Sequence, residues 1–303
     1  MSCFAFQWHL SDRCNLRCAH CYQADHTAAR EQGAGFWLKL LEHICRGLGS
    51  DESLAINLTG GEPLLLDDLP VLAEALEQNP RVSEWQLISN GTIAFGPAFE
   101  ALKACRKLQV VKISVEAGRP EANDAVRGSG SFRRVEENLE RFRGLGRPLV
   151  AMVTLGAHNL PTLDSCWPWV VEQGLDGLLL ERFVPLGSGL HLAPGPVDET
   201  TWRRALRRLA LQVGMDTAEE DLDWVRALWI RRGSEGDVEL VAAACELGES
   251  MALMPDGEVF ACRRLPRGLG RMPEQSFGDI RAKLVTLWPL TAGCRALSEA
   301  LLR

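Results

Sequence analysis

The 303-residue sequence has no apolar run long enough to cross a bilayer and no basic segment leading into an apolar core at its N-terminus. Without a long apolar run we expect no membrane-spanning helix, and without a basic segment before an apolar core there is no sign of a targeting peptide. Basic residues are also in the minority, since 33 Lys and Arg stand against 40 Asp and Glu, for a net charge of −7. This acidic balance argues against a nucleic-acid binder, and we expect neither nucleic acid nor membrane as a partner.

Cysteine, in contrast, is plentiful. Ten cysteines in a chain without a secretory signal predict cofactor ligands and buried thiols rather than a disulfide framework. This usage favours a reducing compartment, so we expect a cytoplasmic protein. The composition of 46% hydrophobic and 24% charged residues allows a sizeable core and suits one large domain with a small one.

Three of the cysteines, Cys14, Cys18 and Cys21, form a C-x3-C-x2-C run directly after the first apolar segment. Three thiolates at this spacing can hold a [4Fe-4S] cluster whose fourth iron has no protein ligand and is open to chemistry. A structural zinc site is the alternative, and His20 or Cys3 could supply the fourth ligand that it needs. The run alone leaves both interpretations open.

A second motif, Thr59-Gly60-Gly61-Glu62-Pro63, follows the second apolar segment. Adjacent glycines at a strand end let the backbone approach a ligand closely. The Glu62 carboxylate only accepts hydrogen bonds and therefore suits a ligand ammonium group. An ordinary strand-to-helix turn is the competing interpretation of this segment alone.

The cysteine run, the aromatic Tyr22 after it and the Gly-Gly-Glu-Pro segment together resemble the radical S-adenosylmethionine (radical SAM) superfamily. The resemblance implies that Cys14, Cys18 and Cys21 hold a [4Fe-4S] cluster and that SAM chelates its open iron. It also implies that one electron from the cluster cleaves SAM to methionine and a 5′-deoxyadenosyl radical, which abstracts a hydrogen atom from the substrate.

Apolar patterning predicts six strand–helix units in the first 190 residues. We expect strands at residues 3–10, 54–58, 84–89, 109–115, 149–155 and 178–184, and helices at residues 36–48, 67–78, a stretch ending at 105, 131–143 and 163–173. Right-handed crossovers would fold these units into an α/β, partial (β/α)6 TIM-like barrel with its chemistry at the carboxyl ends of the strands.

Candidate residues fall at these strand ends. Asn90 follows the third strand, Glu116 the fourth, and Arg182 lies at the end of the sixth. By resemblance, Glu116 holds the SAM ribose, Ser114 and Arg127 hold the SAM carboxylate, and Tyr22 lies beside adenine. A strand hydroxyl and a surface arginine are the plain alternatives for Ser114 and Arg127. The full predicted cofactor-binding set is Tyr22, Gly60, Gly61, Glu62, Asn90, Ser114, Glu116, Arg127 and Arg182.

We expect the barrel to span residues 1–190, a helical connector 191–240 and a small C-terminal α+β domain 241–303. Glycine and proline at 187–196 mark the exit from the barrel. The connector is predicted to hold helices at residues 201–213 and 221–232, with tryptophans that belong to the core. Residues 253–262 predict a β-hairpin with a Pro-Asp-Gly turn.

Cys245, Cys262 and Cys294 resemble ligands of the SPASM/Twitch extension of radical SAM enzymes, here in truncated form. Arg281, Leu284 and Leu290 stand where that extension has further cysteines. The resemblance therefore implies one auxiliary iron–sulfur cluster rather than two. An extension that binds zinc or nothing is the alternative.

The SPASM/Twitch branch mostly modifies peptides and proteins, so the first expectation is peptide maturation by cross-linking, epimerisation or oxidation. The alternative is a small-molecule dehydrogenase or epimerase of the aminoglycoside type. Met1 stands only a few residues before the first strand, so we expect a separate protein to present any leader peptide. An electron donor of the flavodoxin or ferredoxin type is the other expected partner.

Three further cysteines receive provisional roles. Cys166 is the candidate hydrogen-atom donor that would complete an epimerisation, although its sequence neighbourhood does not identify an activated thiol. Cys45 and Cys105 lie in predicted helices, and we expect both to be buried, inert thiols.

Overall fold

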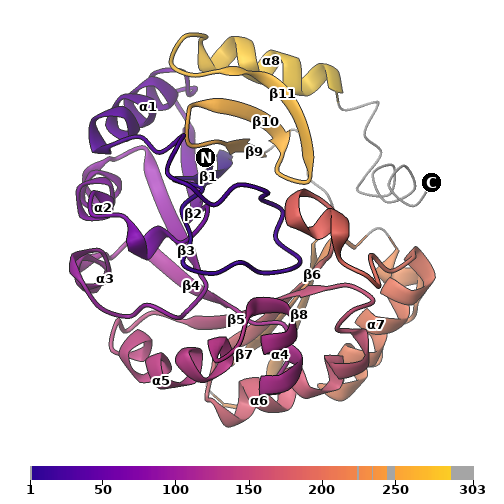
Figure 1. The fold of residues 1–303 in the computed structure, drawn as a ribbon. Coiled ribbons are helices and arrows are strands. Elements are labelled where there is room, and N and C mark those ends of the chain that lie inside the picture. Colours follow the sequence, from indigo (N-terminus) through magenta and orange to yellow (C-terminus); the bar gives the residue numbers. More distant parts are fainter. Residues whose placement is uncertain (1, 224, 234, 244–249, 288–303) are drawn as a thin grey trace.

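The computed structural model describes residues 2–223, 225–233, 235–243 and 250–287. Six parallel strands form the wall of a partial barrel and follow one another in chain order (Figure 1). They are β1 (Ser2–His9), β2 (Glu52–Thr59), β3 (Val82–Ser89), β4 (Leu108–Ser114), β5 (Leu149–Leu155) and β6 (Gly177–Arg182), each paired in parallel with the next. The predicted α/β class and partial barrel are confirmed.

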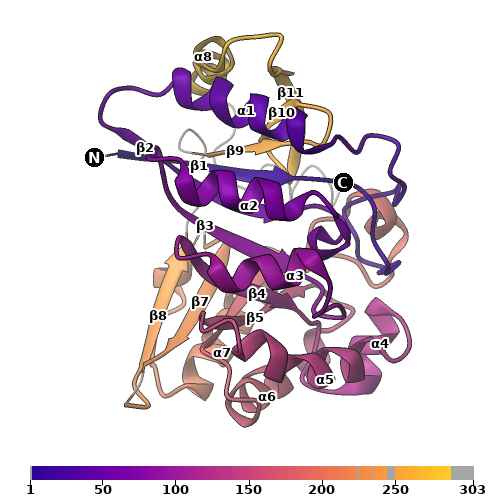
Figure 2. The same cartoon turned by 90° about the vertical axis from the view of Figure 1, so that its left-hand side faces the viewer.

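Helices cover the outside of this wall (Figures 1 and 2). They are α1 (Ala34–Arg46), α2 (Leu69–Gln78), α3 (Pro97–Ala101), α5 (Ser131–Arg143), α6 (Cys166–Glu172), α7 (Glu199–Gln212) and α8 (Phe277–Leu287). The helix α4 (Pro120–Arg127) lies beside the carboxyl ends of the strands instead. Short 3-10 turns lie at Pro63–Leu65, Leu102–Ala104, Leu160–Ser165, Gly187–His191 and Glu220–Leu222. In α5, Phe132, Val135, Leu139 and Phe142 are buried at helical spacing, which fixes the face that packs on the sheet. None of the helices that the structure describes is long and apolar enough to cross a membrane.

Strand residues alternate between two environments, as the pleat requires. In β4, Val111 and Ile113 belong to the main core beneath the helices. Val110 belongs to a second, smaller apolar cluster, and Lys112 lines a cavity. Because Val110 and Lys112 share one face of the strand, this second cluster and the cavity both lie inside the barrel.

The sheet continues past both edges of the barrel and has eleven strands within the described residues. Strands β7 (Ala227–Arg232) and β8 (Val238–Ala243) extend it from β6 in antiparallel fashion. At the other edge, β9 (Ser250–Leu253) pairs in parallel with β1 and is followed by the antiparallel strands β10 (Glu258–Cys262) and β11 (Leu265–Arg271). The barrel therefore has a two-stranded hairpin added beside β6 and three strands added beside β1.

The predicted helix at residues 221–232 is wrong. The second half of that segment is β7, in which Leu228 and Ile230 pack into the main core while Ala227 and Trp229 face the inner cluster. Apolar residues on both faces of a strand can imitate helical spacing over a few residues. Pairing with the open edge of β6 decides the outcome, since tertiary pairing overrides local propensity.

The other helix and the hairpin predicted for this half of the chain are confirmed. The helix predicted at 201–213 is α7, and its Trp202 is fully buried. The predicted hairpin is formed by β9 and β10, with Gly257 at φ 85° in the turn. The boundaries at residues 190 and 240 stay predictions. Cys245 and Cys294 lie outside the described residues.

Candidate active site

A cavity of about 450 Å³ opens at the carboxyl ends of the six parallel strands and extends into the barrel. The residues of the predicted site that line it are Cys14, Cys18, Cys21, Tyr22, Gly60, Gly61, Asn90, Ser114, Glu116, Arg127, Arg182 and Cys262. Glu62 lies directly behind the glycines, and Cys166 does not line the cavity. The strand topology thus brings together residues that are far apart in the sequence, as expected for this end of a barrel.

The cysteine loop between β1 and α1 places three half-buried thiols on one cavity. Backbone N–H groups of Leu16 and Gln23 donate to the sulfurs of Cys14 and Cys21, each at 3.4 Å. Asn90 approaches the Cys14 sulfur with its side-chain amide at 3.8 Å. These donors suit sulfur that carries negative charge, as metal-bound thiolate does.

Burial raises the pKa of all three thiols, that of Cys21 to about 11. Without a bound metal group the thiols are therefore protonated at neutral pH, and metal binding releases the protons. No three of the described His, Cys, Asp and Glu residues are grouped closely enough to hold a single metal ion. The fit of an iron–sulfur cluster therefore rests on the three thiols, their amide donors and the cavity that they share.

Gly60 and Gly61 allow the loop after β2 to lie directly on the cysteine loop. The Gly61 N–H donates to the Ser11 carbonyl at 2.7 Å. A Cβ atom on Gly61 would lie 2.0 Å from the carbonyl oxygen of Arg13, and Gly60 has a φ of 135° that disfavours other residues. The glycine pair was predicted to let the backbone approach a ligand, and here it lets one backbone approach another.

Glu62 fastens the same loops to the end of β3. Its carboxylate is 1% exposed and accepts hydrogen bonds from the Leu64 N–H at 3.1 Å, the Ser89 hydroxyl at 2.9 Å and the Asn90 N–H at 2.7 Å. Burial raises the pKa of this carboxyl. Its predicted role as a ligand for an ammonium group stays a prediction.

Glu116 and Arg127, both predicted to bind SAM, pair with each other. One Glu116 oxygen lies 2.8 Å from Arg127 Nη1 and 2.9 Å from His20 Nε2. The other oxygen accepts a hydrogen bond from the Thr154 N–H at 3.2 Å. Burial opposes ionisation of Glu116, but His20 and Arg127 outweigh it and lower the pKa. His20, considered as a zinc ligand from the sequence, is directed at Glu116.

Tyr22 joins the cysteine loop to the C-terminal hairpin. Its hydroxyl donates to the Gly60 carbonyl at 3.1 Å and lies 3.2 Å from His9 Nδ1. The Arg263 guanidinium lies 4.0 Å from the centre of the Tyr22 ring and donates to the Tyr22 carbonyl at 3.1 Å. The hairpin that carries Cys262 is therefore attached to the loop that carries the other cysteines.

The remaining predicted residues are placed as follows. Ser114 and Asn90 face the cavity, and the Asn90 amide also donates to the Asn15 side chain at 2.8 Å. Arg182 is held by Glu199 at 2.5 Å and by the Val197 carbonyl at 2.7 Å. Cys166 lies in the hydrophobic core, where burial raises the pKa of its thiol to about 12. In this conformation Cys166 has no contact with the cavity.

The other cysteines follow a mixed pattern. Cys105 is buried, as expected, Cys45 is half-buried, and Cys3 is exposed. Burial raises the pKa of the Cys105 thiol to about 12. Both Cys45 and Cys105 pack with the main core, which agrees with their interpretation as structural thiols.

Sequence reasoning missed the polar residues inside the barrel. Six of them line the cavity, one from each parallel strand: Gln7, Asn57, Gln86, Lys112, Thr154 and Glu181. The signal was present, since each is a polar residue one to three residues before the end of an apolar strand. An inward polar position of this kind is typical of a barrel that binds a ligand rather than filling its interior with apolar side chains.

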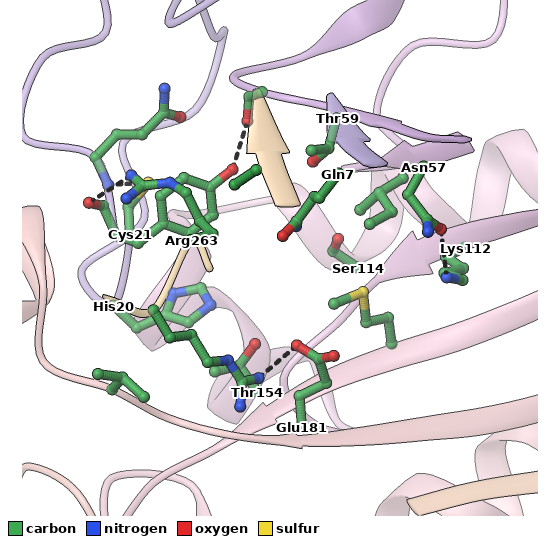
Figure 3. Close-up of a pocket in the computed structure, with 18 of the residues that line it drawn as sticks. Gln7, His20, Cys21, Asn57, Thr59, Lys112, Ser114, Thr154, Glu181 and Arg263 are labelled. Atoms are coloured by element: carbon green, nitrogen blue, oxygen red, sulfur yellow. Dashed lines mark hydrogen bonds and ion pairs between the residues drawn. The ribbon is translucent and has the colours of Figure 1, made fainter. Parts of the chain in front are cut away.

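Charge is concentrated among these inner residues (Figure 3). Glu181 pairs with Arg264 at 2.6 Å and with Arg226 at 3.3 Å. Lys112 donates to the Asn57 side chain at 3.0 Å and lies 4.9 Å from the centre of the Trp229 ring. Burial lowers the pKa of Lys112 to about 8. Burial opposes ionisation of Glu181, but Arg264, Arg226 and Lys112 lower its pKa to about 2.

Comparison with known proteins supplies the family. The profile of the Radical SAM superfamily matches residues 8–163, which include the cysteine run, the glycine pair and Glu116. The chain belongs to the radical SAM superfamily. The resemblance inferred from the two motifs is thereby confirmed, and this family uses a [4Fe-4S] cluster with SAM.

Individual relatives differ in what their names describe. Pre-heme d1 synthase of Dinoroseobacter shibae is 31% identical over 219 residues, which cover 70% of this chain and 51% of the relative. Streptococcus suis SuiB bound to its precursor peptide SuiA has a TM-score of 0.68 at 14% identity, over 97% of this chain and 67% of SuiB. The enzyme anSMEcpe with bound AdoMet and the Cp18Cys peptide has a TM-score of 0.68 at 15% identity, over 92% and 80%.

These likenesses have defined limits. The two solved structures establish the fold, because identity near 15% carries no more than that. The chain spans about half the length of pre-heme d1 synthase and two thirds of SuiB. The radical SAM fold is thus shared, and the reaction must be argued from this chain's own residues.

The contact between the glycine pair and the cysteine loop can be tested with Gly61→Ala. We expect a loss of about 1–3 kcal/mol in the free energy of unfolding, the usual cost of overpacking, together with reduced iron incorporation. The matched control is Gly35→Ala, where a Cβ atom meets nothing within 4 Å and alanine favours the helix. Urea unfolding measures both variants, and a Gly61→Ala protein as stable as wild type would contradict the close contact.

The buried Glu116–Arg127 pair predicts a non-additive response. Glu116→Gln leaves the Arg127 guanidinium buried without a carboxylate, and we expect a cost of about 3–5 kcal/mol in unfolding free energy. Adding Arg127→Met should recover part of that loss. The exposed pair Arg133–Glu137 is the control, and Glu137→Gln should cost less than about 1 kcal/mol. Additive losses in the double variant would show that the pair is not coupled.

Proposed function

We propose that this radical SAM enzyme abstracts a hydrogen atom from a C–H bond of a peptide or protein and so matures it by cross-linking, epimerisation or oxidation. When bound, the cluster and SAM supply the 5′-deoxyadenosyl radical. Cys14, Cys18 and Cys21 would hold the cluster. Ser114, Glu116 and Arg127 would orient SAM, with Tyr22 beside its adenine.

One observation carries the proposal. The three thiols, the Glu116–Arg127 pair and a polar inner compartment line a single cavity of about 450 Å³. A radical formed at the thiols would therefore arise in the same space as a substrate held deeper in the barrel, and proximity of this kind is the protein's main contribution to such a reaction. Fold similarity to SuiB and anSMEcpe, both seen with peptides, supports a peptide as the substrate.

A small-molecule dehydrogenase or epimerase is the second candidate. The charged side chains Lys112, Glu181, Arg226 and Arg264 favour it, because a compact polar substrate could be surrounded by them. The relative named pre-heme d1 synthase also supports this alternative.

We also propose one auxiliary iron–sulfur cluster held by Cys245, Cys262 and Cys294. The support is the position of Cys262, which lines the cavity at the end of β10 and whose sulfur accepts the Arg264 N–H at 3.4 Å. A flavodoxin- or ferredoxin-type protein would deliver electrons, and a separate protein would present a leader peptide.

The reaction is tested with anaerobically reconstituted enzyme, dithionite and SAM. We expect 5′-deoxyadenosine to form and a peptide encoded near the gene to change in mass, because the radical removes hydrogen from it. Cys14→Ala should abolish both signals, and Cys3→Ala, an exposed thiol, should leave them unchanged. If the peptides keep their mass while an aminocyclitol or a tetrapyrrole carboxylate is consumed, the small-molecule reaction replaces peptide maturation as the proposed function.

The auxiliary cluster is tested by iron and sulfide content. The triple variant Cys14→Ala, Cys18→Ala, Cys21→Ala should keep about four irons, one [4Fe-4S] cluster, because the C-terminal thiols remain. Adding Cys262→Ala should remove them. If the wild type holds a single cluster and the triple variant holds no iron, the proposed auxiliary cluster is contradicted.

A further inference from the structure

The described lining of the cavity reverses the charge balance of the chain. Acids outnumber bases by 40 to 33 in the whole sequence. Among the described residues that line the cavity, in contrast, six are Lys or Arg and two are Glu. Two of the six bases have their own carboxylates, since Arg127 pairs with Glu116 and Arg182 with Glu199. The excess of positive charge therefore lies elsewhere on the wall.

Three of the other bases line the cavity around one acid. Lys112, Arg226 and Arg264, together with the Glu181 that pairs with both arginines, are called here the inner basic site. Figure 3 labels Lys112 and Glu181. Glu181 contacts both guanidinium groups and lies close enough to Lys112 for each to shift the pKa of the other. Among the described residues, Glu181 is the one carboxylate that lines the cavity beside Lys112 and Arg226, so it cannot neutralise both of these cations.

Lys112 is the most confined of the three cations. Its side chain is 6% exposed, and its ammonium group, which has three donors, makes one hydrogen bond that the described contacts identify, to Asn57. The Trp229 ring offsets part of the desolvation by a cation–π contact. A buried ammonium with unused donors is costly unless an anion joins it.

The position of Lys112 connects this site with the radical chemistry. Lys112 and Ser114 lie on the same face of β4, so Lys112 is one pleat, about 7 Å, deeper than a residue predicted to hold SAM. Asn57, Gln86 and Gln7 complete a ring of amide side chains on the neighbouring strands. A molecule held at Lys112 would extend from there toward the cysteine loop.

We propose that the inner basic site binds a carboxylate or phosphate group of the substrate and thereby sets which C–H bond faces the radical. The claim that the bound substrate reacts with the radical rests on the proposed function. The claim that the inner basic site binds an anion does not. The anionic group could belong to an acidic peptide side chain or to a small acid, and both sources present the same chemistry.

The test is titration calorimetry on reconstituted, SAM-loaded enzyme with four probes. Acetyl-Gly-Glu-Gly-amide and its Gln counterpart test the peptide source, and citrate and inorganic pyrophosphate test the small-molecule source. We expect at least one anionic probe to bind and the Gln peptide to fail. The probe that binds more tightly identifies the source.

Variants test whether the inner basic site is responsible. Lys112→Met and Arg226→Met should each weaken binding about tenfold or more, equal to about 1.4 kcal/mol, and Lys112→Arg should retain much of it. Glu181→Gln should strengthen binding, because it removes the competing carboxylate. A misfolded variant would bind the anion more weakly, so stronger binding by Glu181→Gln cannot result from misfolding. The controls Lys103→Met and Arg133→Met remove exposed charges outside the cavity and should have no effect.

Two results would overturn the inference. One is the absence of heat with every anionic probe at about 10 mM, which would mean affinity weaker than about −4 kcal/mol. The other is anion binding that Lys112→Met, Arg226→Met and Glu181→Gln all leave unchanged. Formation of 5′-deoxyadenosine is measured separately. Its absence in an enzyme that binds the anion would contradict the proposed function and leave the binding site intact.

Discussion

The contact between two backbones, at Gly60–Gly61 and residues 11–13, is the constraint on which the rest of the site depends. Hydrogen bonds from Gly61 and Glu62 to the cysteine loop hold that loop on the end of β2. Only residues without a Cβ atom allow this approach. Glu62 then ties the joined loops to the end of β3 through Ser89 and Asn90. The thiols are thus positioned by three strand ends rather than by their own loop.

Two buried carboxylates organise the charge along the cavity wall. Glu116 pairs with Arg127 and His20. Glu181 pairs with Arg226 and Arg264, while Lys112 lies one pleat deeper than Ser114 on β4. Electrostatic interactions are strong in such a confined space. We infer that the residues around Glu116 serve the cofactor and those around Lys112 the substrate.

Local patterns predicted the features that depend on neighbouring residues. The cysteine run, the Gly-Gly-Glu-Pro segment, the six parallel strands and α7 were all identified from the sequence. Features that depend on contacts between residues far apart in the sequence were not predicted. Residues 227–232 form a strand because the edge of β6 is open to them. The inner basic site draws on β4, β6, the residue before β7 and the turn after β10, so no local segment contains it.

The role of Glu62 illustrates the same limit. The sequence indicates a carboxylate beside two glycines, which suits a ligand, but the three donors that surround it come from two separate strand ends. For Cys166 the sequence left the environment undefined, and the packing of α6 against the core removes its thiol from the cavity. Motif chemistry identified the cavity, and the fold decided which side chains enter it.

The central claim is that Cys14, Cys18 and Cys21 hold a cluster with an iron open to SAM. The most direct measurement is the EPR spectrum of the anaerobically reconstituted, dithionite-reduced protein with and without SAM. This account predicts a reduced-cluster signal that changes when SAM is added and that loses this response in the triple alanine variant, because SAM binds the open iron. A wild-type spectrum that SAM leaves unchanged would contradict it.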